Sequence, residues 1–206
     1  MEKFRKYLSD SSSVSLLITN FIVIVLAIIQ KWDISTVLWV YWMQSIIIGF
    51  FQFLRILSLR KFSTENFTIN NKSVSSTVQT KLFAAFFFIF HYGFFHFLYA
   101  IFLFNFFTSQ SFDLTHLFLG GLIFFINHFF SYQHNKMIDQ QKTLPAGRQV
   151  QNIGHLMFSP YARIVPMHLI VIFGAILGQS ALIIFLLLKT VSDLLMHTIK
   201  HKMSDS

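Results

Sequence analysis

Residues 82–107 read LFAAFFFIFHYGFFHFLYAIFLFNFF, a run without Lys, Arg, Asp or Glu. A helix needs about 20 predominantly apolar residues to cross a hydrocarbon core roughly 30 Å thick. The run is long enough for that purpose, and Phe is its commonest residue. It therefore predicts a membrane-spanning helix. Its few polar side chains, which include two histidines, are the first candidates for a function.

The composition of the whole chain supports the same class. Of its 206 residues, 54% are hydrophobic and only 12% are charged, and the mean hydropathy is +0.60. A soluble domain carries about a quarter charged residues. The composition therefore predicts an integral membrane protein. The chain has no Cys, which excludes disulfides, thiolate nucleophiles and Cys-ligated zinc or iron–sulfur centres.

Six apolar runs of membrane-spanning length are found along the sequence. They predict an all-α integral membrane protein, a six-helix transmembrane bundle that forms a single domain over residues 1–206. The loops between the second and third spans and between the fourth and fifth are the long ones, 58–81 and 133–160. We expect the first of them to be a mobile polar loop. The predicted spans are 14–30, 34–57, 82–107, 113–132, 161–178 and 181–199.

The basic residues alternate between the two sides of this arrangement. Of 16 Lys and Arg, all but two fall before the first span, in or beside the two long loops, or after the last span. Lys31 lies in the first connection and Lys189 lies within the last span. Cytoplasmic loops carry the excess of Lys and Arg, so both termini are predicted to be cytoplasmic. This bias accounts for the net charge of +8 without a nucleic-acid partner.

Ionisable residues within membrane spans are costly and usually functional. The helical rise places His91 about 15 Å from Lys81, near the middle of the bilayer. Lys189, Asp193 and His197 recur every four residues and so share one helix face. These positions predict a polar cavity that opens toward the cytoplasm.

The polar residues fall into three sets of candidates. Imidazole and carboxylate side chains are ligands for zinc or iron and are also suited to a proton relay. The candidate ligands or relay groups are His91, His168, Asp193 and His197. The candidates for binding an anion or forming an ion pair are Arg163 and Lys189. The supporting polar residues are Gln44, Tyr92, His96 and His128.

Several functions are compatible with these residues. A metal-assisted enzyme acting on a lipid or another small molecule is the leading hypothesis. A proton-coupled transporter, a b-type haem held between His91 and His168, and a structural scaffold are the alternatives. No nucleophile elbow, P-loop, dinucleotide-binding fingerprint or His-Glu-x-x-His motif is found in the sequence. The expected partners are the bilayer and an anionic lipid or small-molecule ligand.

Two further expectations concern packing. Gly93 is predicted to allow close approach of a neighbouring helix. Trp39, Tyr41 and Trp42 resemble an aromatic belt at the outer membrane interface.

Four short motifs occur in order along most of the chain. They are Tyr41-Trp42-x-Gln44, His91-Tyr92-Gly93, Pro160-Tyr161-x-Arg163 with Met167-His168, and Lys189-x-x-x-Asp193-x-x-x-His197. In this order the chain resembles a prokaryotic membrane family described only as domain of unknown function 6498. The resemblance implies a multi-pass protein of the prokaryotic cytoplasmic membrane and brings no activity. The position of Gln44 is often Glu in that family, so this chain lacks a carboxylate there.

Overall fold

The computed structural model describes residues 11–106, 113–140, 150–165 and 169. These residues are mostly helical. Three helices are long and apolar enough to cross a membrane. They are α3 (Ile34–Ser58), α4 (Val78–Phe106) and α5 (Leu114–Asp139). The predicted class, a helical protein with membrane-compatible helices, is therefore confirmed. Span 181–199 and most of span 161–178 lie outside the described residues.

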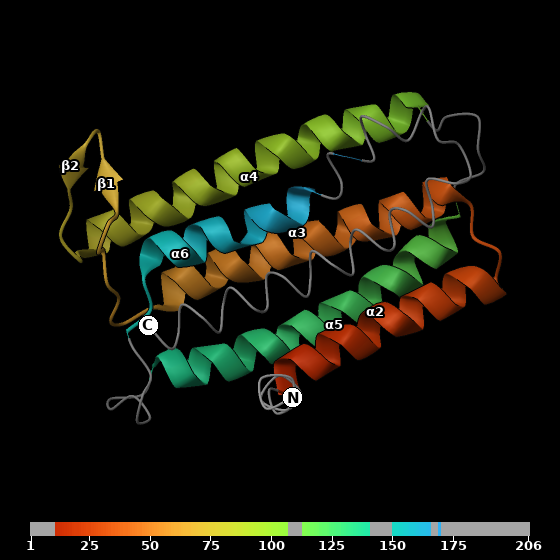
Figure 1. Ribbon diagram of the computed structural model, residues 1–206, viewed down its shortest axis with the longest axis horizontal. Helices are drawn as coiled ribbons and strands as arrows, with labels where there is room; N and C mark the ends of the chain where they lie inside the picture. Colours follow the sequence, from red (N-terminus) through yellow and green to blue (C-terminus); the bar gives the residue numbers. More distant parts are fainter. Residues whose placement is uncertain (1–10, 107–112, 141–149, 166–168, 170–206) are drawn as a thin grey trace, which may run out of the picture.

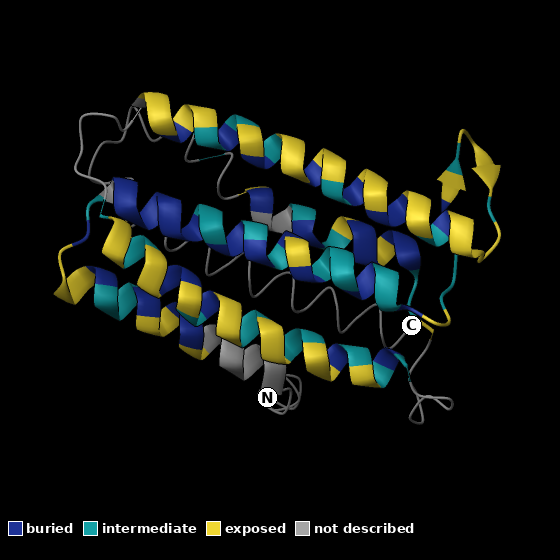
Figure 2. Ribbon diagram, turned by 180° about the vertical axis from the view of Figure 1, so that it is seen from behind, coloured by how far each residue is buried: buried dark blue, intermediate teal, exposed yellow. Residues whose placement is uncertain are grey.

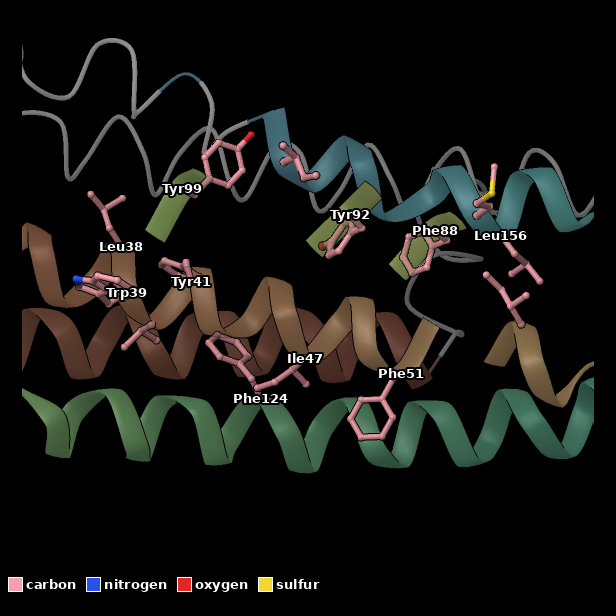
Figure 3. Close-up of a cluster of buried hydrophobic side chains, with 14 of the residues drawn as sticks. Leu38, Trp39, Tyr41, Ile47, Phe51, Phe88, Tyr92, Tyr99, Phe124 and Leu156 are labelled. Atoms are coloured by element: carbon pink, nitrogen blue, oxygen red, sulfur yellow. The ribbon is translucent and has the colours of Figure 1, made fainter. Parts of the chain in front are cut away.

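The long helices run side by side, and α3 lies between α4 and α5 (Figure 1). A fourth helix, α2 (Ser11–Ile29), packs along α5. The position of α3 explains why its sequence is apolar almost throughout, with Leu38 and Val40 fully buried. Aromatic rings from α3, α4 and α5 fill the space between the helices (Figure 3).

Two glycines allow the helices to approach closely. A Cβ added at Gly49 of α3 would lie 2.5 Å from the Tyr92 ring of α4. A Cβ added at Gly120 of α5 would lie 2.7 Å from Val40 Cγ1 of α3. At Gly93, which is exposed, an added Cβ would meet no described atom within 4 Å, so none of the described helices makes the close approach predicted there. Spacing along one helix does not reveal which of its faces meets a neighbour.

The outer faces of α4 and α5 are rich in exposed phenylalanine (Figure 2). On α4, the side chains of Phe90 and Phe97 are 84% and 61% exposed. Apolar surface of this extent is disfavoured in water and is typical of a face that meets lipid or another helix.

The polar segment after α3 contains an ordered hairpin rather than only a mobile loop. Strands β1 (Thr68–Ile69) and β2 (Lys72–Ser73) pair antiparallel, with Thr68 opposite Ser73. Asn70 and Asn71 connect them with φ angles of 51° and 60°. A two-residue turn with two positive φ angles matches the twist of a hairpin, and Asn tolerates that conformation. Hydropathy does not detect this local turn chemistry.

The predicted loop 133–160 is also partly helical. Helix α5 continues to Asp139, and a short helix α6 (Ile153–Phe158) leads into a 3-10 helix, η1 (Ser159–Arg163). The side chain of Asn152 caps α6 by accepting hydrogen bonds from the N–H groups of Gly154 and His155, at 2.9 and 3.2 Å. Hydropathy placed the boundary of α5 too early, because a helix can continue beyond its apolar segment.

The two predicted long loops meet at one end of the bundle. The N–H of Ser63 donates to the carbonyl of Gln151 at 2.9 Å, and the N–H of Ile153 donates to the carbonyl of Ser63 at 3.0 Å. From this end, α6 and η1 run back against α3 and α4 (Figure 1). The segment therefore brings the Pro160-Tyr161 motif beside the middle of α4.

Candidate functional site

The site is built where η1 reaches α4. The hydroxyl of Tyr161 lies 2.8 Å from His91 Nδ1, a distance that corresponds to a hydrogen bond. The ring of Tyr161 also meets the rings of Tyr92 and Phe88 edge-on, with centroids 5.5 and 6.1 Å away. Two motifs that are 70 residues apart in the sequence are thus in contact.

Aromatic rings surround the His91 imidazole. Phe87, one turn earlier on α4, stacks almost parallel to it at 5.3 Å and 13°. Phe95, one turn later, meets it edge-on at 5.2 Å. The His91 residue itself is exposed. The imidazole therefore lies in an aromatic frame on the outer surface of the described helices.

His96, five residues further on, faces the interior. Its Nδ1 lies 2.8 Å from the carbonyl oxygen of Tyr92. A carbonyl only accepts, so Nδ1 carries the proton and Nε2 is the acceptor. The hydroxyl of Ser45 then donates to Nε2 at 2.8 Å. The Tyr92 hydroxyl lies 2.7 Å from Ser45 Oγ and donates to the Ser45 carbonyl at 3.0 Å. This network links α3 to α4 (Tyr92 in Figure 3).

The first motif reaches the same network from α3. The indole N–H of Trp42 donates to the carbonyl of His96 at 2.9 Å. Gln44, one of the supporting polar residues, is buried and donates to Asn20 Oδ1 of α2 at 3.4 Å. The aromatic belt is a wrong prediction for Trp39 and Tyr41, which are 7% and 3% exposed. They pack inside the bundle because α3 is surrounded by other helices.

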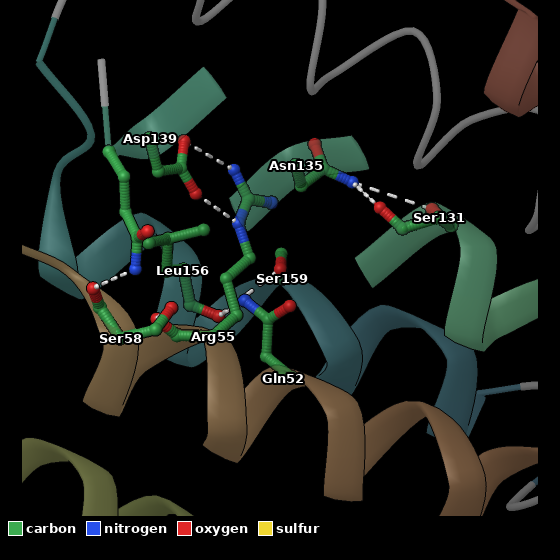
Figure 4. A network of polar contacts seen from close by, with 9 residues as sticks. Gln52, Arg55, Ser58, Ser131, Asn135, Asp139, Leu156 and Ser159 are labelled. Atoms are coloured by element: carbon green, nitrogen blue, oxygen red, sulfur yellow. Dashed lines mark hydrogen bonds and ion pairs between the residues drawn. The ribbon is translucent and has the colours of Figure 1, made fainter. Parts of the chain in front are cut away.

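A buried ion pair was missed by sequence reasoning. Arg55 Nε lies 2.7 Å from Asp139 Oδ2, and Nη2 lies 3.1 Å from Oδ1 (Figure 4). The pair joins the last turns of α3 and α5. Beside it, the Gln52 side chain donates to the carbonyl of Leu156 at 2.6 Å and so holds α6. In the sequence, Arg55 is one of the basic residues that flank the long loop 58–81. The sequence contained one signal for this pair: Asp139 is one of only eight acidic residues, so a specific partner could be expected for it.

The remaining predicted site residues are placed only in part. His128 is half-buried on α5. The backbone of Arg163 belongs to η1, and its side chain lies outside the described atoms. Also outside the described residues lie His168, Lys189, Asp193 and His197. Within the described part of the chain, no group of three or more metal-ligating side chains is found. The metal site stays a prediction.

Taken together, three of the four motifs converge on the middle of α4. Buried hydrogen bonds join that helix to α3, and an aromatic frame surrounds His91. These features define a helical, membrane-type protein with a polar site built between α4 and the returning segment α6–η1.

The chain belongs to the Family of unknown function (DUF6498), whose model matches residues 2–206. The resemblance seen in its motifs is thereby confirmed. No curated protein and no solved structure matches the chain. The geometry of the site is therefore the basis for a function.

Proposed function

We propose that the protein is a six-span integral membrane protein of a prokaryotic cytoplasmic membrane, with both termini in the cytoplasm. The alternation of basic residues supports this orientation. A second support is the contact between Ser63 and the segment 151–153, because an even number of spans between two loops returns the chain to the same side.

The absence of Cys makes the topology directly testable. Single cysteines that replace Ser73, Ser111 and Ser204 report on the hairpin, the connection between the third and fourth spans, and the C-terminus. We expect a membrane-impermeant maleimide added to intact cells to label only the cysteine at 111. Labelling of the cysteine at 204 in intact cells would contradict the six-span arrangement.

For the chemistry, we propose a metal-assisted reaction at His91. The observation that carries this proposal is the hydrogen bond between His91 Nδ1 and the Tyr161 hydroxyl. If Nδ1–H donates to the phenol oxygen, the Nε2 lone pair is left for a metal ion. Histidines that bind metals commonly donate their other ring N–H to a neighbouring group, which orients the ring. The other proposed ligands are His168, Asp193 and His197, with zinc or iron as the metal. Arg163 or Lys189 would hold an anionic group of a lipid or small-molecule substrate.

Metal analysis of the purified protein tests this proposal. We expect about one equivalent of zinc or iron in the wild type and none in His91→Ala. Tyr161→Phe should weaken metal affinity roughly 10–100-fold, because it removes only the orienting partner. His155→Ala is the matched control, since His155 is an exposed histidine of α6. A folded wild type without metal, after zinc and iron supplementation, would reject the metal role.

A proton-coupled carrier is the second candidate, favoured by a different observation. The hydroxyls of Ser45 and Tyr92 and the His96 imidazole form a continuous chain of groups that can exchange protons. This function predicts substrate-dependent proton flux in proteoliposomes that is lost in His96→Phe. Flux that is equal in the wild type and the variant would reject this role for the network.

A further inference from the structure

We propose that the His91–Tyr161 site binds an uncharged, planar carbonyl compound that is dissolved in the bilayer, of the quinone class. The proposal goes beyond the proposed function, because its ligand is uncharged and meets a proton, not a metal ion, on His91 Nε2. It rests on α4 spanning the membrane and on the site at His91, and it does not depend on a metal ion.

The depth of His91 points to a ligand from the lipid phase. Lys81 lies at the loop end of α4, where its ammonium group donates to the carbonyl of Leu59 at 2.9 Å. His91 follows ten residues later, and the helical rise places it about 15 Å deeper. Phospholipid head groups lie outside a hydrocarbon core roughly 30 Å thick. A head group is therefore too far away, whereas a compound dissolved among the acyl chains reaches the exposed imidazole.

The shape of the site favours a flat ring. Phe83, Phe87 and His91 lie one turn apart and form a ladder of nearly parallel rings, with angles of 18° and 13° between neighbours. Phe95 closes one end of this ladder edge-on, and Phe158 flanks Tyr161 with its centroid 6.0 Å away. Aromatic rings prefer offset-stacked or edge-to-face partners. A quinone ring can fit beside the ladder at His91, whereas an acyl chain gains no such geometry.

The polar groups at the site match carbonyl oxygens. Among the described residues, His91 Nε2 has no hydrogen-bond partner, and Nδ1 meets the Tyr161 hydroxyl. When the Tyr161 hydroxyl donates to Nδ1, the imidazole carries its proton on Nε2 and offers that N–H to a carbonyl oxygen. Within the same residues, no carboxylate, ammonium or guanidinium group is bonded to either ring. The described polar groups at the site are thus an imidazole and a phenol, and they match an uncharged ligand with hydrogen-bond acceptors.

Binding of decylbenzoquinone to the full-length protein in lipid nanodiscs tests the inference, with empty nanodiscs as the blank. Decylbenzene is the matched control compound, because it has the chain and the ring without the carbonyl groups. We expect saturable binding of the quinone and only partitioning of decylbenzene. His91→Phe keeps a ring and removes the nitrogen, and we expect it to weaken quinone binding about tenfold, the effect of one hydrogen bond.

Two variants on the same helix distinguish specific binding at His91 from non-specific adsorption to the exposed apolar surface. Phe87→Leu removes the ring that stacks on His91, and we expect affinity to fall about fivefold, within the range for an aromatic pair. Phe90→Leu alters an exposed Phe three residues away and should leave affinity unchanged. Quinone binding that is unsaturable, or equal in the wild type and His91→Phe, would overturn the inference.

Repeating the titration with a chelator distinguishes this inference from the metal proposal. Quinone binding that survives metal removal supports the site as drawn. Absence of quinone binding in a protein that retains its metal overturns the ligand class and leaves the metal proposal in place. A folded wild-type protein that binds neither quinone nor metal would reject His91 as a functional residue.

Discussion

The guanidinium of Arg55 and the carboxylate of Asp139 form a two-point ion pair that joins the ends of α3 and α5, with their side chains only 7% and 1% exposed. A cation is favourable in the last turn of a helix, and a carboxylate there is unfavourable. Asp139 is thus held at the end of α5 by a charge from another helix. The same end of α3 also carries the hydrogen bond from Gln52 to α6, so the pair lies beside the base of the candidate site.

Breaking this pair should be more harmful than replacing it. We expect Asp139→Leu to lower the free energy of unfolding by about 3 kcal/mol, because Arg55 is left as a buried charge without its partner. The double variant Arg55→Leu with Asp139→Leu should recover much of that loss. Unfolding of the detergent-purified proteins measures both. Arg55→Leu alone completes the cycle. A double variant whose loss equals the sum of the losses in Asp139→Leu and Arg55→Leu would show that the pair is not coupled.

Two glycines should respond to alanine in opposite directions. Gly49→Ala places a Cβ 2.5 Å from the Tyr92 ring and should cost about 1–3 kcal/mol through overpacking. Gly93→Ala meets open space and should be neutral or stabilising by up to about 1 kcal/mol, because alanine has the better helix propensity. Thermal melts of the two variants make the comparison. A destabilised Gly93→Ala would mean that another element covers this face of α4.

The hydrogen bond between Ser45 and His96 should contribute to stability. Ser45→Ala leaves the buried His96 Nε2 without its donor, and we expect a loss of about 1–3 kcal/mol. Ser73→Ala, in the exposed strand β2 of the hairpin, is the matched control. Equal unfolding free energies for the two variants would contradict the interhelical role of Ser45.

The contact between the two polar segments depends on Asn152. Its side-chain oxygen caps α6, and its amide donates to the carbonyl of Glu65 at 2.8 Å. Asn152→Ala removes both functions and should destabilise the segment by about 1 kcal/mol or more. Asn152→Asp keeps the cap and loses only the donor, so it should be milder. Hydrogen exchange of residues 150–158 measures the difference, and equal protection in both variants would argue against the capping role.

The positions of the candidate residues were predictable to different degrees. The opposite directions of His91 and His96 follow from helical periodicity alone, and the structure places one outside and the other inside. The partner of His91 was not predictable, because Tyr161 reaches it only through the return of α6 and η1 along α3 and α4. Arg55 illustrates the same limit, since a charged residue at the end of an apolar run fits an interfacial anchor as well as a buried pair.

By itself, the sequence determined a helical protein with membrane-compatible helices and the family, because composition, apolar run length and short motifs are read without tertiary contacts. Asn70 and Asn71 suit the turn between β1 and β2, but the sequence analysis predicted only a mobile polar loop there. Only the tertiary structure decided that Gly49 meets another of the described helices, that Trp39 and Tyr41 are buried, and that Asp139 has a cationic partner. Those outcomes depend on which helix faces lie against each other, and that choice is made by the fit of side chains far apart in the chain.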